Sequence, residues 1–356
     1  MSGSARHFAC IMAGGSGERF WPMSRARTPK HLLKLWSDRT LVEETVRRVS
    51  RAVAPGNIYV LTNAVQLPAT QAALAGLVPA EQIVAEPAKR DTAPAAALAT
   101  ALVRARGGDE AALALLPADA YIADEAGFGA QLALALPRAA AGHAILTIAI
   151  KPGLAATGFG YLEMGEELLR GEGGVVRRVR RFVEKPNAAT AQRYVESGNF
   201  AWNAGMFFWS VRTFLAEAEA NAPELAAFVR GFPAGDFSGY LAARFAALPK
   251  ISVDYAIMEK ARAVETLLAK FDWDDVGLWT ALPKHLPADA GGNATRGTVY
   301  AANATGNIAV SNGRAIALCG VKDLVVVETA DAVLVCHRDA VQEIKKIVQQ
   351  LPPELQ

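Results

Sequence analysis

Short runs of consecutive apolar residues alternate with longer amphipathic segments through the first part of the chain. The apolar runs have the length of buried strands and fall at 7–12, 58–62, 83–85, 113–116 and 145–150. The segments between them predict helices. Thr40 and Glu43 form a capping box at the start of one, and an alanine-rich helix follows Asp91 and extends to about Arg106. The other two helices are expected at 64–77 and 125–139.

This alternation of strands and helices with short connections predicts an α/β fold with a doubly wound, mostly parallel sheet. In such a sheet, ligands bind at the carboxyl ends of the strands. Several polar motifs of the sequence come directly after a predicted strand. We therefore expect these motifs to gather at one edge of the sheet.

Past Lys151 the pattern changes to antiparallel strands and further helices. Strands are expected at 159–163 and 175–183 around a glycine-rich turn at 171–174, followed by a helix at 188–197 and a strand at 207–210. Further helices are expected around Thr213, Tyr240 and Asp254. This part of the chain is expected to build the second wall of a cleft.

The composition changes again beyond Pro287. Short strands are expected at 298–301, 308–310, 315–318, 324–328 and 332–336, and a final helix at 339–351, without a strict repeat. We therefore expect two domains, a large one at 1–287 and a small β domain at 288–356 for which a β-helix-like stack is one solution.

The composition excludes some functional classes. The 356 residues include 37 basic and 35 acidic side chains. This balance lacks the excess of positive charge that is typical of proteins that bind nucleic acid or an anionic membrane. No apolar run reaches membrane length and no signal-peptide core is present, so we expect a cytoplasmic protein. Three cysteines in apolar runs predict reduced core thiols, and the glycosylation patterns at Asn293 and Asn303 are expected to be idle.

A glycine-rich stretch follows the first strand and carries several cations. Backbone N–H groups left open by glycine, followed by fixed cations, suit a polyphosphate, although a plain linker with surface arginines is the alternative. Gly17-Glu18-Arg19 does not match a Walker loop, and Phe20 replaces the third glycine of a dinucleotide fingerprint. Trp21-Pro22 and Thr28-Pro29 are expected to keep the segment extended. The residues concerned are Gly14, Gly15, Ser16, Gly17, Arg19, Arg25, Arg27 and Lys30.

Two carboxylates stand at strand or loop ends where a metal ion could lie. Asp119 ends the strand before it, and Asp275 lies in a loop flanked by Trp273 and Trp279, with Asp274 as a competitor. Mg²⁺ commonly takes one or two carboxylates together with phosphate oxygens and water. A turn cap is the alternative for Asp119, and a solvated acidic face is the alternative for the second loop.

A second group of polar residues suits a sugar phosphate. Lys185 suits a phosphate monoester and Glu184 suits sugar hydroxyls, and because neighbours on an extended chain point in opposite directions the two need not pair. Asn203 adds an amide beside a glycine, and the turn at Gly160 and Tyr161 could face a sugar ring. An ordinary surface strand end and aromatic core packing are the alternatives.

The order of these motifs resembles that of the sugar-phosphate nucleotidylyltransferases, and most closely the mannose-1-phosphate guanylyltransferase branch. The motifs are Gly-Gly-Ser-Gly-Glu-Arg, Pro-Lys-His, Glu-Pro-x-x-Arg-Asp-Thr-Ala-Pro, Leu-Pro-Ala-Asp, Gly-Tyr, Val-Glu-Lys-Pro, Trp-Asn-Ala-Gly-Met, Ser-Val-Asp-Tyr and Asp-Val-Gly-Leu-Trp. The resemblance covers nearly the whole chain. It implies a triphosphate on Gly14, Gly15, Gly17, Arg19 and Lys30, Mg²⁺ on Asp119 and Asp275, and mannose 1-phosphate on Gly160, Tyr161, Glu184, Lys185 and Asn203.

The reaction implied by the resemblance is transfer of GMP from GTP to mannose 1-phosphate, giving GDP-mannose and pyrophosphate, with a homodimer expected by family analogy. Arg19, Lys30 and Asp119 would carry the chemistry. A guanine pocket needs acceptors for the base N–H groups, for which Glu86 and Asp91 are candidates, although Asp91 also suits a helix cap. Another hexose-1-phosphate nucleotidylyltransferase and a catalytically silent sugar-nucleotide sensor are the alternatives.

Overall fold

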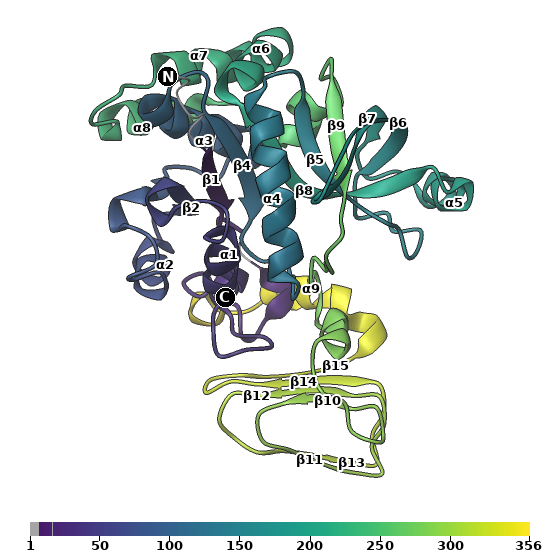
Figure 1. Ribbon diagram of the computed structural model, residues 1–356. Coiled ribbons are helices and arrows are strands. Elements are labelled where there is room, and N and C mark those ends of the chain that lie inside the picture. The colour runs from purple at the N-terminus through teal and green to yellow at the C-terminus, as the bar shows by residue number, and fades with distance from the viewer. Residues whose placement is uncertain (1–6, 16) are drawn as a thin grey trace.

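A computed structural model describes residues 7–15 and 17–356 of the chain. Ser16, which the sequence places in the phosphate loop, lies outside the described residues. A nine-stranded sheet has the order β3-β2-β1-β4-β8-β5-β9-β7-β6 (Figure 1). Its strands are β1 (His7–Met12), β2 (Ile58–Asn63), β3 (Ile83–Glu86), β4 (Ala112–Pro117), β5 (Ile145–Ile150), β6 (Tyr161–Gly171), β7 (Gly174–Val183), β8 (Phe200–Ser210) and β9 (Val264–Leu268).

The sheet is doubly wound, as the sequence predicts. Strands β1 to β4 are parallel, and β5 pairs in parallel with β9, while β8 runs antiparallel between β4 and β5. The antiparallel hairpin of β6 and β7 around the glycine turn is also confirmed. The helices are α1 (Leu41–Val49), α2 (Leu67–Ala73), α3 (Thr92–Gly107), α4 (Glu125–Ala140), α5 (Ala188–Ser197), α6 (Val211–Asn221), α7 (Pro223–Gly231), α8 (Ser238–Arg244) and α9 (Ile344–Val348).

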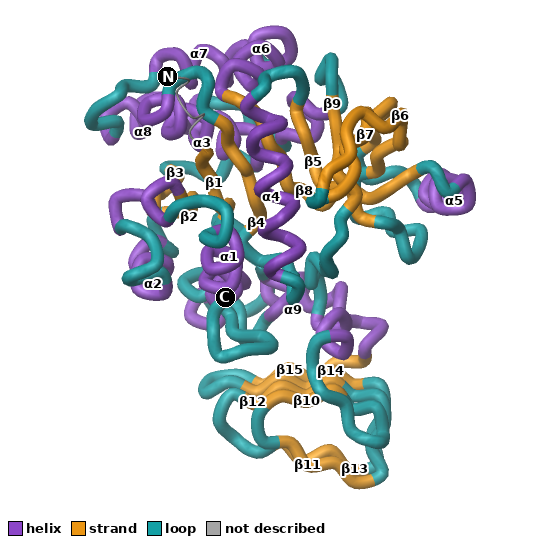
Figure 2. Tube along the Cα trace, in the orientation of Figure 1, coloured by secondary structure: helices purple, strands orange, loops and turns teal. Residues whose placement is uncertain are grey.

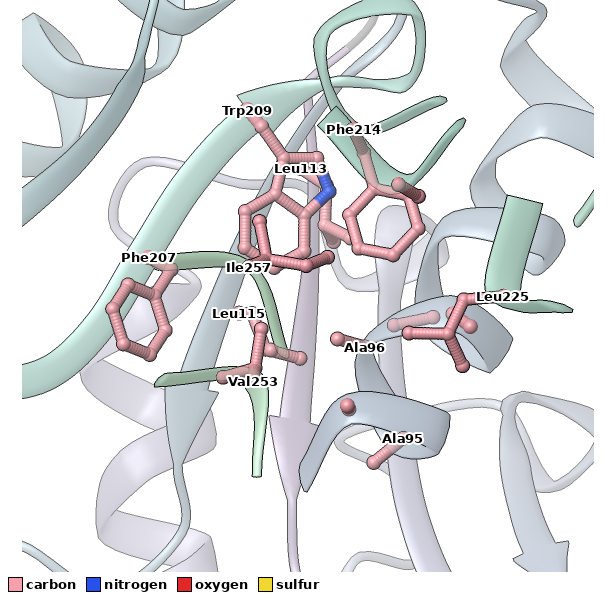
Figure 3. Close-up of a cluster of buried hydrophobic side chains, with 14 of the residues drawn as sticks. Ala95, Ala96, Leu113, Leu115, Phe207, Trp209, Phe214, Leu225, Val253 and Ile257 are labelled. Atoms are coloured by element: carbon pink, nitrogen blue, oxygen red, sulfur yellow. The ribbon is translucent and has the colours of Figure 1, made fainter. Parts of the chain in front are cut away.

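Alternate residues of β1 face two separate hydrophobic cores because successive side chains of a strand point to opposite faces. Phe8 and Cys10 pack in the core that includes α3, α6 and α7, whereas Ala9 and Ile11 pack in the core that includes α1 and α4. Figure 3 shows part of the first core, in which Trp209, Phe214 and Leu113 lie together. Both faces of the sheet are therefore covered, and polar chemistry is confined to its edge.

The glycine-rich segment departs from the predicted extended chain. It forms two 3₁₀ turns, at Glu18–Phe20 and Lys30–Leu32, and the first α-helix after it begins only at Leu41. The prediction of an extended segment was therefore wrong in these two turns. The capping box is confirmed, since the Thr40 side chain accepts from the Glu43 backbone N–H and Glu43 accepts from the Thr40 backbone N–H.

The C-terminal strands stack as coils of a β-helix below the large sheet (Figures 1 and 2). One wall has the order β10-β12-β14-β15 and the other pairs β11 with β13. The strands are β10 (Ala294–Arg296), β11 (Val299–Ala302), β12 (Ile308–Ser311), β13 (Ile316–Cys319), β14 (Leu324–Glu328) and β15 (Val333–His337). Ala294 pairs with Ile308, which pairs with Val325, so successive coils differ in length and leave no strict sequence repeat.

An asparagine ladder closes one corner of this β-helix. Asn293 and Asn307 are fully buried, and the Asn293 Oδ1 accepts hydrogen bonds from the backbone N–H and the Nδ2 of Asn307. The Oδ1 of Asn307 in turn accepts from the backbone N–H of Leu324 in the next coil. Asn293, part of a glycosylation pattern, thus supports the fold, because a buried backbone N–H needs a partner.

Two other expectations need correction. Cys319 is exposed rather than buried, because its neighbours Ile316 and Leu318 occupy the inward positions of β13. The predicted final helix is divided into a 3₁₀ turn at Arg338–Glu343 and α9. Within the described residues, the structure contains no helix that is long and apolar enough to cross a membrane.

Candidate active site

Gly17 is the glycine of the loop whose conformation most clearly excludes a side chain. Its φ is +65°, a left-handed conformation that favours glycine. A Cβ atom at this position would lie 2.4 Å from the Cβ of Lys30. The bare backbone at Gly17 therefore lets the Lys30 segment pack directly against the loop.

A cavity of about 440 Å³ opens beside this loop and the ends of β1 and β3. Its lining includes Gly14, Gly15, Gly17, Lys30, Glu86, Asp91 and Asp119, whereas Arg19, the other residue predicted to bind the triphosphate, is not in this lining. Asp91 also caps α3, because its Oδ1 accepts from the Thr92 N–H at 2.7 Å. Both interpretations of Asp91 are thus compatible with its position.

Glu86 lies at the end of β3, and its side chain is partly buried in this cavity. A Cβ atom on Gly14 would lie 3.4 Å from the Glu86 Oε2, so the carboxyl group and the glycine loop are close neighbours. Burial raises the pKa of Glu86 from 4.5 to about 7 because the charged form loses hydration. A half-titrated carboxyl group therefore faces the cavity at neutral pH.

Asp119 and Asp275 come together because their loops are hydrogen-bonded to each other. Tyr121 and Asp274 form an antiparallel bridge, with N···O distances of 2.8 and 3.1 Å. Lys30 connects the two aspartates, since its Nζ lies 2.9 Å from the Asp119 Oδ2 and donates to the Asp275 backbone carbonyl oxygen at 2.8 Å. The predicted metal ligands and the predicted catalytic lysine therefore form one cluster.

The carboxylate of Asp274 already has hydrogen-bond partners of its own, which distinguishes Asp274 from Asp275. Its carboxylate accepts from the Val276 N–H at 2.8 Å and lies 3.2 Å from the His285 Nε2. Burial raises the pKa of Asp275, and the nearby Lys30 partly opposes this rise. Two oxygen-donor carboxylates, Asp119 and Asp275, suit a hard cation that takes its remaining ligands from phosphate and water. Among the described residues no group of three acidic, histidine or cysteine side chains is placed to hold a metal.

Helix α1 supports the Asp119 loop from behind. Thr45 Oγ1 donates to the carbonyl oxygen of Ala118 at 3.0 Å, and Arg48 Nη2 donates to that of Ala120 at 2.7 Å. The carbonyl oxygens of the two residues that flank Asp119 are thus held by buried side chains. Burial lowers the pKa of Arg48 only to about 10, so its guanidinium remains charged at neutral pH.

A second cavity of about 260 Å³ lies between the Asp119 loop and the β6–β8 region. Gly160, Glu184 and Asn203 line it together with Asp119 and Asp275. At Gly160 a Cβ atom would lie 2.6 Å from the Glu184 Oε2, so the glycine lets this carboxylate approach the backbone closely. This cavity therefore collects part of the predicted sugar-phosphate group.

Two predicted residues are not in the lining of that cavity. Tyr161 is fully buried, and its hydroxyl donates to the Ala156 carbonyl oxygen at 2.8 Å. Lys185 has a half-exposed side chain, and its Nζ lies 2.6 Å from the Glu184 Oε1. Glu184 and Lys185 thus pair, although neighbours on an extended strand need not, and the φ of +44° at Lys185 interrupts the alternation of an extended strand.

Asp254 is a lining residue for which sequence reasoning gave no role. It begins a π-helical turn, Asp254–Met258, and its Oδ1 accepts from the Asn203 Nδ2 at 3.3 Å. Burial and the nearby Glu184 raise the pKa of Asp254 to about 7. The motif Ser-Val-Asp-Tyr was the available signal, although a single carboxylate in a predicted helix indicates no site by itself.

A third cavity of about 400 Å³ also has Asp119 in its lining, and we call it the cation-rich cavity because four basic residues, Arg19, Lys30, Lys89 and Lys345, line it. Arg19 is exposed in its lining, as the phosphate prediction requires. Sequence reasoning missed Lys89 here, although it lies in the quoted motif after Glu86, and it missed Lys345, which had no motif. Asp119 lines all three cavities, so they meet at this one carboxylate.

A sequence model described as nucleotidyl transferase matches residues 8–290 of this chain. The chain belongs to the nucleotidyl transferase family. A second model, described as the MannoseP isomerase/GMP-like beta-helix domain, matches residues 297–351 and confirms the β-helix expectation. The nucleotidyl transferase assignment agrees with a phosphate loop and a carboxylate pair at one edge of the sheet. Members of the family generally use a divalent metal ion.

Relatives of this nucleotidyl transferase confirm the branch suggested by the motifs. The mannose-1-phosphate guanylyltransferase of Escherichia coli (strain K12) is 37% identical over 350 residues, which cover 97% of this chain and 73% of the relative. That of Sinorhizobium fredii is 37% identical over 348 residues, 96% of this chain and 67% of the relative. The crystal structure of mannose-1-phosphate geranyltransferase from Thermus thermophilus is 32% identical, with a TM-score of 0.88 over 97% of this chain and 99% of that chain.

Proposed function

We propose that this protein transfers GMP from GTP to mannose 1-phosphate, giving GDP-mannose and pyrophosphate. The observation that carries the proposal is the junction of three cavities at Asp119. The first cavity suits the nucleoside, the second the sugar phosphate and the third the leaving pyrophosphate. The α-phosphate then lies at the junction, and the nucleophile and the leaving group occupy two different cavities that meet there, as separate sites for the two groups of an in-line displacement.

The chemistry needs no protein nucleophile. An ionised phosphate oxygen of mannose 1-phosphate attacks the α-phosphorus of GTP and forms the new P–O bond, while the bond from that phosphorus to the bridging oxygen breaks. Pyrophosphate leaves with the bonding electrons. The task of the protein is to hold two mutually repelling anions in line and to neutralise their charge.

Lys30 and Arg19 are proposed to stabilise the α-phosphate and the leaving pyrophosphate. Lys30 lines both the nucleoside cavity and the cation-rich cavity, and Arg19 lines the latter. Asp119 and Asp275 are proposed to hold Mg²⁺, whose charge would neutralise phosphate oxygens and lower the barrier to attack. Glu184 and Asn203 are proposed to bind the sugar, with Asp254 as an additional acceptor.

Glu86 and Asp91 are proposed to recognise guanine. The base presents N1–H and an exocyclic amine as donors, and a carboxylate accepts both. Adenine lacks this pair of donors.

A substrate panel tests the proposed reaction. Purified protein is incubated with each of four nucleoside triphosphates and with mannose 1-phosphate or glucose 1-phosphate, and pyrophosphate release is measured. Turnover with GTP and mannose 1-phosphate supports the proposal. Turnover only with another pair identifies a different hexose-1-phosphate nucleotidylyltransferase, and GDP-mannose binding without any turnover identifies a sensor.

We expect the affinity for GTP to depend on pH through Glu86. Only the deprotonated carboxylate accepts both guanine donors, so the KM for GTP should rise about tenfold per unit as the pH falls below about 7. Measuring the KM for GTP at saturating mannose 1-phosphate isolates this titration from that of Asp254, which faces the sugar cavity.

The matched variants are Glu86→Gln and Glu81→Gln, the latter at an exposed acid. Glu86→Gln should flatten the pH dependence of the KM for GTP and reduce the preference for guanine over adenine. Glu81→Gln should behave like the wild-type protein. An unchanged profile in Glu86→Gln would remove Glu86 from base recognition.

The remaining proposals concern the domain boundaries, the oligomeric state and the cellular location. We propose a catalytic domain at 1–287 and a small β domain at 288–356, supported by the start of the first β-helix strand at Ala294. We also propose a homodimer, for which the exposed apolar residues Val333 and Val335 of the edge strand β15 offer a contact surface. A cytoplasmic location stays a prediction.

A further inference from the structure

The C-terminal segment packs against the glycine-rich loop although more than 300 residues separate them in sequence. Ile344 and Val348 of α9 share a buried cluster with Phe20 and Trp21. The Trp21 Nε1 donates to the carbonyl oxygen of Leu355 at 2.8 Å. The position of α9 relative to the loop is therefore fixed by apolar burial and by a hydrogen bond.

This packing brings Lys345 to the cation-rich cavity. Lys345 lines it together with Arg19, Lys30 and Lys89. Three of these cations come from the large domain, and Lys345 comes from α9 in the C-terminal segment. The lining also contains Glu18, Asp119 and Asp275, so the four basic residues exceed the acidic ones by one, and each cation can add charge-assisted hydrogen bonds to phosphate oxygens.

The ion pair of Lys345 leaves its ammonium group available. Its Nζ lies 3.9 Å from the Glu18 Oε2, beyond hydrogen-bond distance, and the Lys345 side chain is 56% exposed. An exposed pair of this length contributes little to stability. The ammonium can therefore turn toward a phosphate without a large cost to the fold.

The neighbouring lysine provides an internal comparison. Lys346 is not among the residues that line the cavity, and its Nζ lies 2.5 Å from the Glu343 Oε2 in an exposed pair on the same helix. The two adjacent lysines thus have the same charge and similar exposure. They differ in whether they face the cavity.

We propose that Lys345 binds the β- and γ-phosphates of the nucleotide and the departing pyrophosphate, so that the C-terminal domain completes the active site. This inference rests on the proposed function, because the bound anion is the leaving group of that reaction. Lys345 acts as a binding residue for that group, whereas Lys30 lies beside the reacting phosphate. The C-terminal domain then contributes a side chain directly to substrate binding.

The test compares Lys345→Ala, Lys345→Arg and Lys346→Ala in the full chain. The reverse reaction, which forms GTP from GDP-mannose and pyrophosphate, gives the KM for each substrate. Lys345→Ala should raise the KM for pyrophosphate about tenfold, as loss of one charged hydrogen bond predicts, and should leave the KM for GDP-mannose within about twofold. Lys345→Arg should restore most of the pyrophosphate affinity, and Lys346→Ala should match the wild-type protein.

Calorimetric titration with pyrophosphate alone separates this inference from the proposed function. If the wild-type protein has no turnover but binds pyrophosphate more tightly than Lys345→Ala does, the reaction is wrong and the anion site stands. If wild-type turnover is normal and Lys345→Ala has the wild-type KM and affinity for pyrophosphate, the inference is overturned. Equal losses in Lys345→Ala and Lys346→Ala would also overturn it, because they would indicate a general charge effect. Thermal unfolding of each variant shows whether the domain contact is intact.

Discussion

Replacing Asp119 by asparagine should reduce formation of GDP-mannose by about a thousandfold or more. The substitution preserves the size of the side chain but removes a negative charge at the point where the three cavities meet. A neutral amide is a poor ligand for Mg²⁺, so charge on the α-phosphate is no longer neutralised in the transition state. The measurement is the steady-state rate of pyrophosphate release over a range of Mg²⁺ concentrations.

The control for this substitution is Asp109→Asn, which removes an exposed carboxylate that pairs with surface Arg104. It should retain wild-type turnover and metal dependence. Both variants should retain the fold. In Asp119→Asn the loop is still held by Thr45 and Arg48 through backbone carbonyls. Normal turnover of Asp119→Asn at ordinary Mg²⁺ concentrations would contradict the assigned role.

Replacing Lys30 by methionine should lower kcat by about a hundredfold to a thousandfold, a range typical of losing one electrostatic contact to a transition state. The KM for mannose 1-phosphate should change by less than about threefold, since Lys30 is not among the residues that line the sugar cavity. Methionine retains an unbranched apolar stem, which suits the buried position beside Phe20.

A second readout distinguishes charge from packing. Lys30 opposes the rise in the pKa of Asp275 caused by burial, so its removal should raise that pKa further. A carboxylate with a higher pKa stays protonated to a higher pH. The acid limb of the pH–rate profile should therefore move to higher pH. Lys34→Met, at an exposed lysine in the same segment, should leave both kcat and the profile unchanged. A wild-type kcat in Lys30→Met would remove Lys30 from the reaction.

The strands of the first half were predictable because each is a nearly continuous apolar run. The run at 145–150 coincides with β5, and the capping box at Thr40 coincides with the start of α1. By contrast, β9 and α7 were missed, and β8 was predicted at 207–210 although it begins at Phe200. The sequence of β9, Val-Glu-Thr-Leu-Leu, is short and mixed, and its pairing with β5 and β7 makes it a strand.

The residues of the candidate active site were likewise only partly predictable from the sequence. The glycine pattern around Gly17 and the aspartate after β4 indicated phosphate and metal chemistry from local spacing. Local spacing could not show that Tyr161 is buried or that the Lys185 ammonium group pairs with the Glu184 carboxylate. Nor could it indicate Lys345, because Glu18 and Arg19, which line the same cavity, lie more than 300 positions away in the sequence.

The sequence by itself determined the class of fold and the family of the reaction, because apolar periodicity and the order of motifs can be followed along the chain without knowing which distant segments meet. Only the tertiary structure decided which carboxylates meet Lys30, which side chains line each cavity and how the C-terminal helix reaches the loop. The physical reason is that these contacts depend on strand pairing and on apolar burial between distant segments. Such contacts are fixed only when the whole chain has folded.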